Sequence, residues 1–144
     1  MCFLREKNKC NKDMKKLTKY EELIAEYENE VLIEERPIQS CALYADGVTW
    51  IRQDLSANKK RCLLAEEIGH YFTSTGDVLE QSNLDNEKQE LKARRWAYEK
   101  LLPEDTIYKA LRHGYTEIWE LSEYLDVDED FLKDALRYYG LLSI

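Results

Sequence analysis

Residues 61–71 of this chain read RCLLAEEIGHY. The apolar side chains in this stretch recur with a helical period, so it predicts an amphipathic helix. In a helix, Glu66 and His70 lie one turn apart on one face, and Glu67 lies beside them. This polar face is either an ordinary solvated acidic surface or part of a functional site, and the rest of the chain has to decide between the two.

Two residues of the same helix indicate that this face is covered. Leu63 falls between Glu67 and His70 around the helix, which indicates that another part of the chain packs there. Gly69 stands inside the helix, although glycine there costs about 1 kcal/mol relative to alanine. Such a glycine is typical of a position where another backbone comes close. We therefore expect a second element to pack tightly against residue 69.

The order Glu66-Glu67-x-x-His70 differs from the zinc-binding pattern H-E-x-x-H at its first residue. In that pattern the two histidines bind zinc and the glutamate acts as general base. The compact zincin spacing places a further histidine six residues after the last one, but Gly76 stands there, which excludes that class. A third ligand would have to come from another element.

A following helix offers such a ligand. It is predicted to begin near residues 85–86 and to end before Pro103. Glu90 lies at the centre of its apolar face, where Ala93 and Ala97 permit a close approach of two helices. A carboxylate on such a face is costly to bury without a partner.

Glu90 has two candidate partners. One is Arg94, one turn further along, in an ordinary ion pair of a helix surface. The other is a metal ion that Glu90 shares with Glu66 and His70. The rival third ligands, in the polar segment between the two helices, are Asp77 and Glu80.

Two motifs, in this order and separation, resemble the ImmA/IrrE family of phage and mobile-element metallopeptidases. They are LAEEIGHY at residues 64–71 and ExxAxxWAxxxLLP at residues 90–103. The resemblance covers most of residues 14–140. It implies that His70 and Glu90 are metal ligands and that Glu67 is the catalytic base. Glu66 stands at the position of the family's first histidine ligand.

The resemblance also implies a cofactor, a function and a partner. The cofactor is one divalent metal ion, zinc, with Glu66, His70 and Glu90 as ligands. Because Glu66 supplies an oxygen in place of a nitrogen, manganese and iron are the alternatives. The implied function is that of a metal-dependent endopeptidase, which cleaves the helix-turn-helix repressor of a phage or mobile element and so relieves repression. The alternative is a catalytically weak or inactive relative that binds a repressor or regulator without cleaving it.

Composition sets further bounds. A chain of 144 residues with 44% hydrophobic content can bury the core of one domain. It contains no apolar run of 18 residues, so we expect no membrane span. Four cysteines without C-x-x-C spacing, in a chain without an export signal, predict reduced thiols and a cytoplasmic location. The net charge of −8 argues against direct nucleic-acid binding.

The predicted fold is α/β, a mostly helical α+β domain with a small three-stranded sheet packed on a zincin-like helix pair. Residues 1–13 are expected to be a basic, flexible extension, and residues 14–105 the metallopeptidase-like domain. A capping box of Thr18 and Glu21 opens the first helix. Strands are predicted near residues 31–33, 41–44 and 48–52, and the last two flank an Asp46-Gly47 hairpin turn.

Residues 106–144 are expected to form a C-terminal helical subdomain that resembles a helix-turn-helix. Its two last helices are predicted over residues 117–125, with Thr116 as the cap, and over residues 128–139. Residues 115–144 carry eight acidic side chains against Lys133 and Arg137, which opposes DNA binding. We therefore predict a packing subdomain that can meet a protein partner. The aromatic side chains expected in its core are Trp119, Tyr138 and Tyr139.

Overall fold

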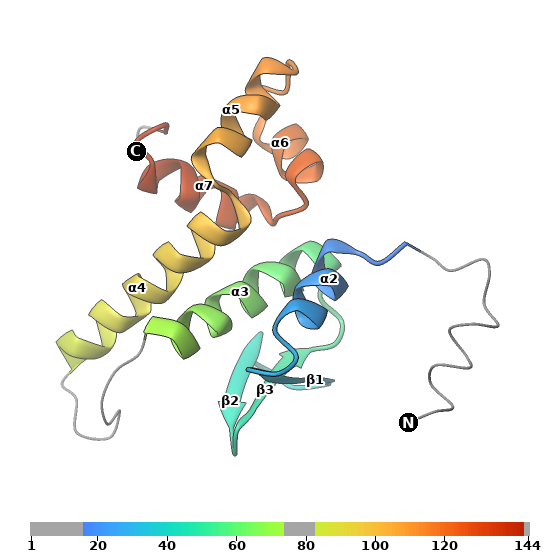
Figure 1. Cartoon of the computed structure of the whole chain (residues 1–144), viewed down its shortest axis with the longest axis vertical. Coiled ribbons are helices and arrows are strands. Elements are labelled where there is room, and N and C mark those ends of the chain that lie inside the picture. Colours follow the sequence, from blue (N-terminus) through green and yellow to red (C-terminus); the bar gives the residue numbers. More distant parts are fainter. Residues whose placement is uncertain (1–15, 74–82, 143–144) are drawn as a thin grey trace.

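A computed structural model describes residues 16–73 and 83–142 of the chain (Figure 1). The elements in chain order are α2 (Lys19–Glu26), β1 (Leu32–Arg36), β2 (Ala42–Ala45), β3 (Val48–Arg52), α3 (Ala57–Thr73), α4 (Asn83–Leu101), α5 (Glu104–Arg112), α6 (Ile118–Leu125) and α7 (Glu129–Tyr138). This is the predicted mostly helical α+β fold with one three-stranded sheet. None of the helices in the described ranges is long and apolar enough to cross a membrane.

Local signals set the first elements as predicted. The Thr18 side chain accepts a hydrogen bond from the backbone N–H of Glu21, and the Glu21 carboxylate accepts one from the backbone N–H of Thr18. Asp46 and Gly47 both have positive φ angles, 53° and 78°, as a two-residue hairpin turn between β2 and β3 requires. Both predictions are confirmed because each depends only on a few consecutive residues.

The sheet has the strand order β1-β3-β2, so β3 is central. β2 pairs antiparallel with β3, and β1 pairs parallel with it. The side chains of Thr49 and Ile51 in β3 are almost fully buried, while the residues of β3 that alternate with them are half-buried. The buried side of β3 contacts α3. The helix that carries Glu66 therefore packs on the sheet, as predicted.

The centre of the fold is the pair formed by α3 and α4, which lie side by side in Figure 1. Gly69 is the point of closest approach, since a Cβ atom at residue 69 would lie only 2.5 Å from the backbone oxygen of Ala93. Ala93 and Ala97 are fully buried opposite α3. The expectation that another backbone packs against Gly69 is confirmed, and the alanines of α4 make this contact possible.

The C-terminal helices α5–α7 follow the end of α4 and lie on the opposite side of the helix pair from the sheet (Figure 1). α3 contacts them at the turn between α6 and α7. The Arg61 guanidinium donates hydrogen bonds to the backbone oxygens of Leu125 and Asp126, at 3.0 and 2.8 Å. The neighbouring Cys62 thiol accepts one from the backbone N–H of Asp128, at 3.4 Å. These contacts cap the end of α6 and fix the start of α7. The proposed domain boundary at residue 105 stays a prediction.

Several detailed predictions were wrong. α4 already includes residues 83–86, so neither Asp85 nor Asn86 is its cap. Glu117, not Thr116, is the N-cap of α6, because the Glu120 carboxylate accepts a hydrogen bond from the Glu117 backbone N–H. Trp119 is 57% exposed and Tyr138 is 38% exposed, so neither belongs to the core, whereas Tyr139 packs against it as predicted. A helical period predicts that aromatic residues share a face, but not which face is covered.

Candidate active site

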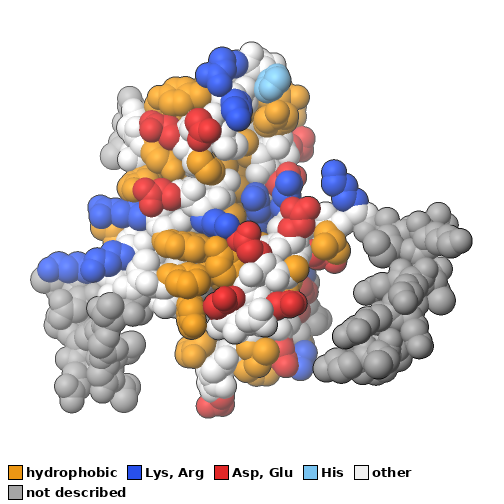
Figure 2. All heavy atoms as spheres, in the orientation of Figure 1, with side chains coloured by type: hydrophobic (Ala, Val, Ile, Leu, Met, Phe, Trp, Pro, Cys, Tyr) orange, Lys and Arg blue, Asp and Glu red, His pale blue; other side chains and the backbone are white. Residues whose placement is uncertain are grey.

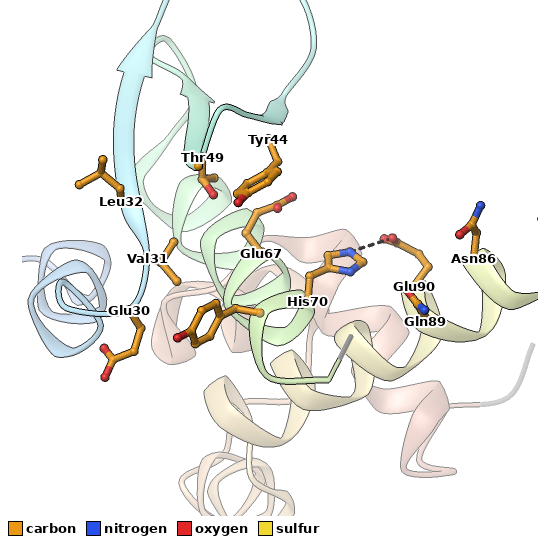
Figure 3. A pocket seen from close by; sticks show the side chains of 12 residues that line it. Glu30, Val31, Leu32, Tyr44, Thr49, Glu67, His70, Asn86, Gln89 and Glu90 are labelled. Carbon is orange, nitrogen blue, oxygen red and sulfur yellow. Dashed lines mark ion pairs between the residues drawn. The ribbon is translucent and has the colours of Figure 1, made fainter. Parts of the chain in front are cut away.

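A pocket of about 570 Å³ opens between the sheet and the α3–α4 pair (Figure 3). This volume lies within the range of ordinary ligand pockets. Side chains from the sheet side and from the two helices line it together. They are Glu30, Val31, Leu32, Tyr44 and Thr49 on one side, and Glu67, His70, Tyr71, Asn86, Gln89 and Glu90 on the other, with Gly47 at the hairpin turn.

His70 and Glu90 meet inside this pocket. The Nε2 atom of His70 lies 2.9 Å from the Oε2 atom of Glu90. Figure 3 shows the imidazole of α3 and the carboxylate of α4 pointing toward one another. The contact joins two residues far apart in sequence. It forms because Gly69, the residue before His70, lets α3 approach the backbone of α4 at Ala93. The sequence therefore places a histidine and a carboxylate at hydrogen-bond distance.

Glu67 shares the pocket with this pair. It projects from α3 toward Tyr44 and Thr49 of the sheet (Figure 3). Burial raises the pKa of the Glu67 carboxyl above its ordinary value; the nearby His70 opposes this shift and Glu90 adds to it. A carboxylate with such a shift, inside a pocket and beside a histidine, is typical of functional sites.

Glu66 lies next to the pocket but does not belong to its lining. Burial raises the pKa of its carboxyl; Arg94 opposes the shift, and the carboxylates of Glu90 and Glu67 add to it. The structure thus brings Glu67, His70 and Glu90 together in one pocket and places Glu66 within electrostatic range of them.

Glu90 contacts Arg94, one of its two candidate partners, and it also contacts His70, the residue with which it was predicted to share a metal ion. Its Oε1 atom lies 3.6 Å from Nε of Arg94, while its Oε2 atom lies at the shorter distance from His70. Its side chain is 42% exposed, so the expectation of a buried carboxylate was wrong. The apolar face of α4 is interrupted at Glu90 because the pocket opens there.

Comparison with protein families gave one match. The model of the IrrE N-terminal-like domain, Peptidase_M78, matches residues 42–137, which is more than half of the chain. The chain belongs to this family. Comparison with characterised proteins and with solved structures gave no match.

Membership of the IrrE N-terminal-like family confirms the resemblance drawn from residues 64–71 and 90–103. The matched range runs from β2 to the last turn of α7, so it contains the whole of α3 and α4 and most of the pocket lining. The domain is metallopeptidase-like.

The side chains around the pocket suit a divalent metal ion in their chemistry. Imidazole nitrogen and carboxylate oxygen are ordinary zinc ligands, and in a tetrahedral site two ligand atoms that each lie about 2.0–2.1 Å from one ion are about 3.3 Å apart. The Nε2–Oε2 distance of 2.9 Å between His70 and Glu90 is that of a direct hydrogen bond, and a small separation of the two side chains would admit an ion. In the described ranges, however, no group of three His, Cys, Asp or Glu side chains is arranged to hold an ion. The set Glu66, His70 and Glu90 therefore stays a prediction.

The rival ligands Asp77 and Glu80 lie outside the described residues. The pocket also contains residues that we did not single out from the sequence. Tyr44 and Thr49 are direct partners in the β2–β3 pairing, so their side chains share one face of the sheet. The two-residue turn at Asp46-Gly47 fixes this register. Counting outward to the second residue pair from the turn would have identified Tyr44 and Thr49 from the sequence.

Proposed function

We propose that this member of the IrrE N-terminal-like family is a metal-dependent endopeptidase that cleaves a helix-turn-helix repressor of a phage or mobile element. The single observation that supports it best is the 2.9 Å contact between His70 and Glu90, inside a pocket that Glu67 also lines. These are a nitrogen ligand, an oxygen ligand and a separate carboxylate that can act as a base, which is the set of groups that a metallopeptidase needs.

Each side chain has a distinct role in the proposed reaction. His70 and Glu90, with Glu66 as the third ligand, would hold a divalent metal ion. A divalent ion bound there supplies Lewis-acid polarisation of the peptide carbonyl. Glu67 accepts the proton of the attacking water and passes it to the leaving amine. Glu67 suits this role because it lies in the pocket beside His70 without taking part in the His70–Glu90 contact.

The sheet side of the pocket suits an extended peptide. β2 lies at the edge of the sheet, and within the described part of the chain it pairs only with β3. An edge strand can accept a peptide as an additional strand through backbone hydrogen bonds. Tyr44 of β2 lines the pocket, and it is 65% exposed. A substrate strand beside β2 would therefore run past Glu67.

The test is incubation of the chain, in zinc or manganese, with a purified helix-turn-helix repressor of a phage or mobile element, followed by mass spectrometry of the products. Glu67→Gln should reduce the rate by a factor of about 100 or more, because a general base contributes about 10²–10⁴ to a rate. The matched control is Glu87→Gln, an exposed acid on α4 outside the pocket, which should cleave at the wild-type rate. Cleavage by Glu67→Gln at the wild-type rate would contradict the proposal.

A second candidate is the relative that binds a repressor without cutting it. It is favoured by the contact of Glu90 with Arg94 and by the position of Glu66 outside the pocket lining. In the same experiment this candidate predicts a stable complex with the intact repressor and no products, with zinc or manganese present. Products that appear only with added metal would exclude it.

A further inference from the structure

The outward face of α6 has an unusual composition. The buried side of this helix carries Leu121, Ser122 and Leu125. At 100° per residue, the opposite arc consists of two aromatic and three acidic side chains, and no lysine, arginine or histidine is present on α6. These residues, here called the α6 face, are Glu117, Trp119, Glu120, Glu123 and Tyr124.

The two aromatic side chains of the α6 face are open to solvent. Trp119 is 57% exposed and Tyr124 is 45% exposed. Tyr124 stacks on Tyr115 at 4.5 Å between ring centroids, which holds its ring in place. Exposed tryptophan and tyrosine side chains, held on a rigid helix, are the residue types that contribute most to protein–protein interfaces. Figure 2 shows acidic and hydrophobic side chains side by side over the end of the molecule that α5–α7 form, with basic side chains gathered at its tip.

Charge decides which kind of partner fits the α6 face. Residues 115–144 contain eight acidic side chains and two basic ones. Nucleic acids and anionic membranes both attract basic surfaces, so this surface repels them. A second copy of the same face would bring like charges together, which is costly at an interface. The kind of partner that fits the α6 face is therefore a protein with a basic surface.

We propose that the α6 face binds the positively charged, DNA-contacting surface of the helix-turn-helix repressor. This inference rests on the proposed function, because that function makes such a repressor the substrate. Helix-turn-helix proteins present lysine and arginine side chains to phosphates around the helix that enters the major groove. The α6 face offers carboxylates to those side chains and aromatic rings to the apolar surface between them. The repressor would use the same surface for its operator and for α6. A repressor bound to DNA therefore cannot dock on α6 and is protected from cleavage.

The test is fluorescence anisotropy with the labelled DNA-binding domain of the helix-turn-helix repressor used in the cleavage assay. The full chain is used with Glu67→Gln, so that cleavage does not interfere with the measurement. Trp119→Ala should raise Kd by about tenfold, as the loss of an interface hot spot does. The double variant Glu120→Gln/Glu123→Gln should weaken binding and reduce its salt dependence. Leu91→Ala, at a residue of α4 that is 45% exposed and lies outside the pocket lining, is the control and should leave Kd unchanged.

Competition completes the experiment. Operator duplex should displace the labelled domain from the chain. Equal Kd values for the wild type, Trp119→Ala and the double glutamine variant would overturn the proposal, as would a ternary complex with the duplex. A chain without residues 1–13 that bound about tenfold more tightly would assign the α6 face to the chain's own basic segment instead.

Failure of this inference can be told apart from failure of the proposed function. Cleavage of the repressor at the same rate by the wild type and by Trp119→Ala would reject docking on α6 and leave the peptidase intact. Binding that depends on Trp119, without any cleavage by the wild type in zinc or manganese, would support docking and reject the peptidase. Circular dichroism and thermal unfolding of Trp119→Ala check that the exposed substitution leaves the fold unchanged.

Discussion

The two sides of α3 differ sharply in what surrounds them. On the packed side, Leu64 and Ile68 are fully buried, and Gly69 lies against the backbone of Ala93. On the open side, Glu67 and His70 line a pocket. The packed side leaves no room for another atom, so its residues are fixed by the fold. The open side holds polar groups that the fold does not need, and such residues are best explained by function.

The pKa values of the carboxyl groups near the pocket also indicate a role in function and not in folding. Burial raises the pKa of Glu66 and of Glu67, and the neighbouring carboxylates add to both shifts. Folding therefore opposes the ionised form of these two groups. A protein that keeps several carboxylates close together at a cost to stability commonly does so for activity.

The largest expected effect concerns the packed side. Gly69→Leu should lower the free energy of unfolding by about 3 kcal/mol, because a Cβ atom at this position already lies 2.5 Å from the backbone oxygen of Ala93. Urea unfolding followed by circular dichroism measures it. The control is Lys92→Leu on the exposed side of α4, which should change stability by about 0.5 kcal/mol or less. Similar stabilities for the two variants would show that the helices can separate at little cost.

The next effect concerns the contact of α3 with the C-terminal helices. Arg61→Met should cost about 2 kcal/mol, since it removes two hydrogen bonds from a charged donor to the backbone oxygens of Leu125 and Asp126. The loss is limited because the buried Nε atom of Arg61 has no hydrogen-bond partner among residues 16–73 and 83–142. Arg112→Met, at an exposed position of α5, serves as the control in the same unfolding experiment. A neutral result for Arg61→Met would mean that the turn between α6 and α7 is held by its apolar contacts alone.

The smallest expected effect has the opposite sign and concerns the open side. Burial raises the pKa of Glu66 in the folded chain, so its carboxyl destabilises the metal-free protein as pH rises above the ordinary pKa of glutamate, and fully so above the raised pKa. Glu66→Gln should therefore stabilise the protein by about 1 kcal/mol at pH 7 with a chelator present. The difference between the variant and the wild type should shrink as pH is lowered toward about 4, where glutamate is protonated. A glutamine variant that is less stable at pH 7 would show that the Glu66 charge supports the fold.

Much of the fold could be predicted because its signals are local. The capping box of Thr18 and Glu21 and the hairpin turn at Asp46-Gly47 each depend on a few neighbouring residues. Gly69 indicated the α3–α4 contact because a glycine inside a helix needs a packing reason. The parallel pairing of β1 with β3 was not predicted, since it joins strands that are not consecutive and no local pattern specifies it.

The candidate site was predicted less completely. The motifs at residues 64–71 and 90–103 identified His70, Glu67 and Glu90, which do share a pocket. Periodicity assigned Glu90 to a buried face, although the pocket leaves it 42% exposed. The same reasoning placed Trp119 in the core. A helical period orders residues around one axis, but the exposure of each side chain depends on which other elements cover it.

Metal content is the measurement that tests the proposed metal site most directly. The purified chain is incubated with zinc or manganese, freed of excess metal and analysed by mass spectrometry under native conditions. The account predicts about one bound ion per chain, lost in Glu66→Ala, His70→Ala and Glu90→Ala but retained in Arg94→Ala. A wild-type chain without an ion, or a Glu90→Ala variant that keeps it, would contradict the metal site. The Glu90 carboxylate would then serve only in its ion pair with Arg94.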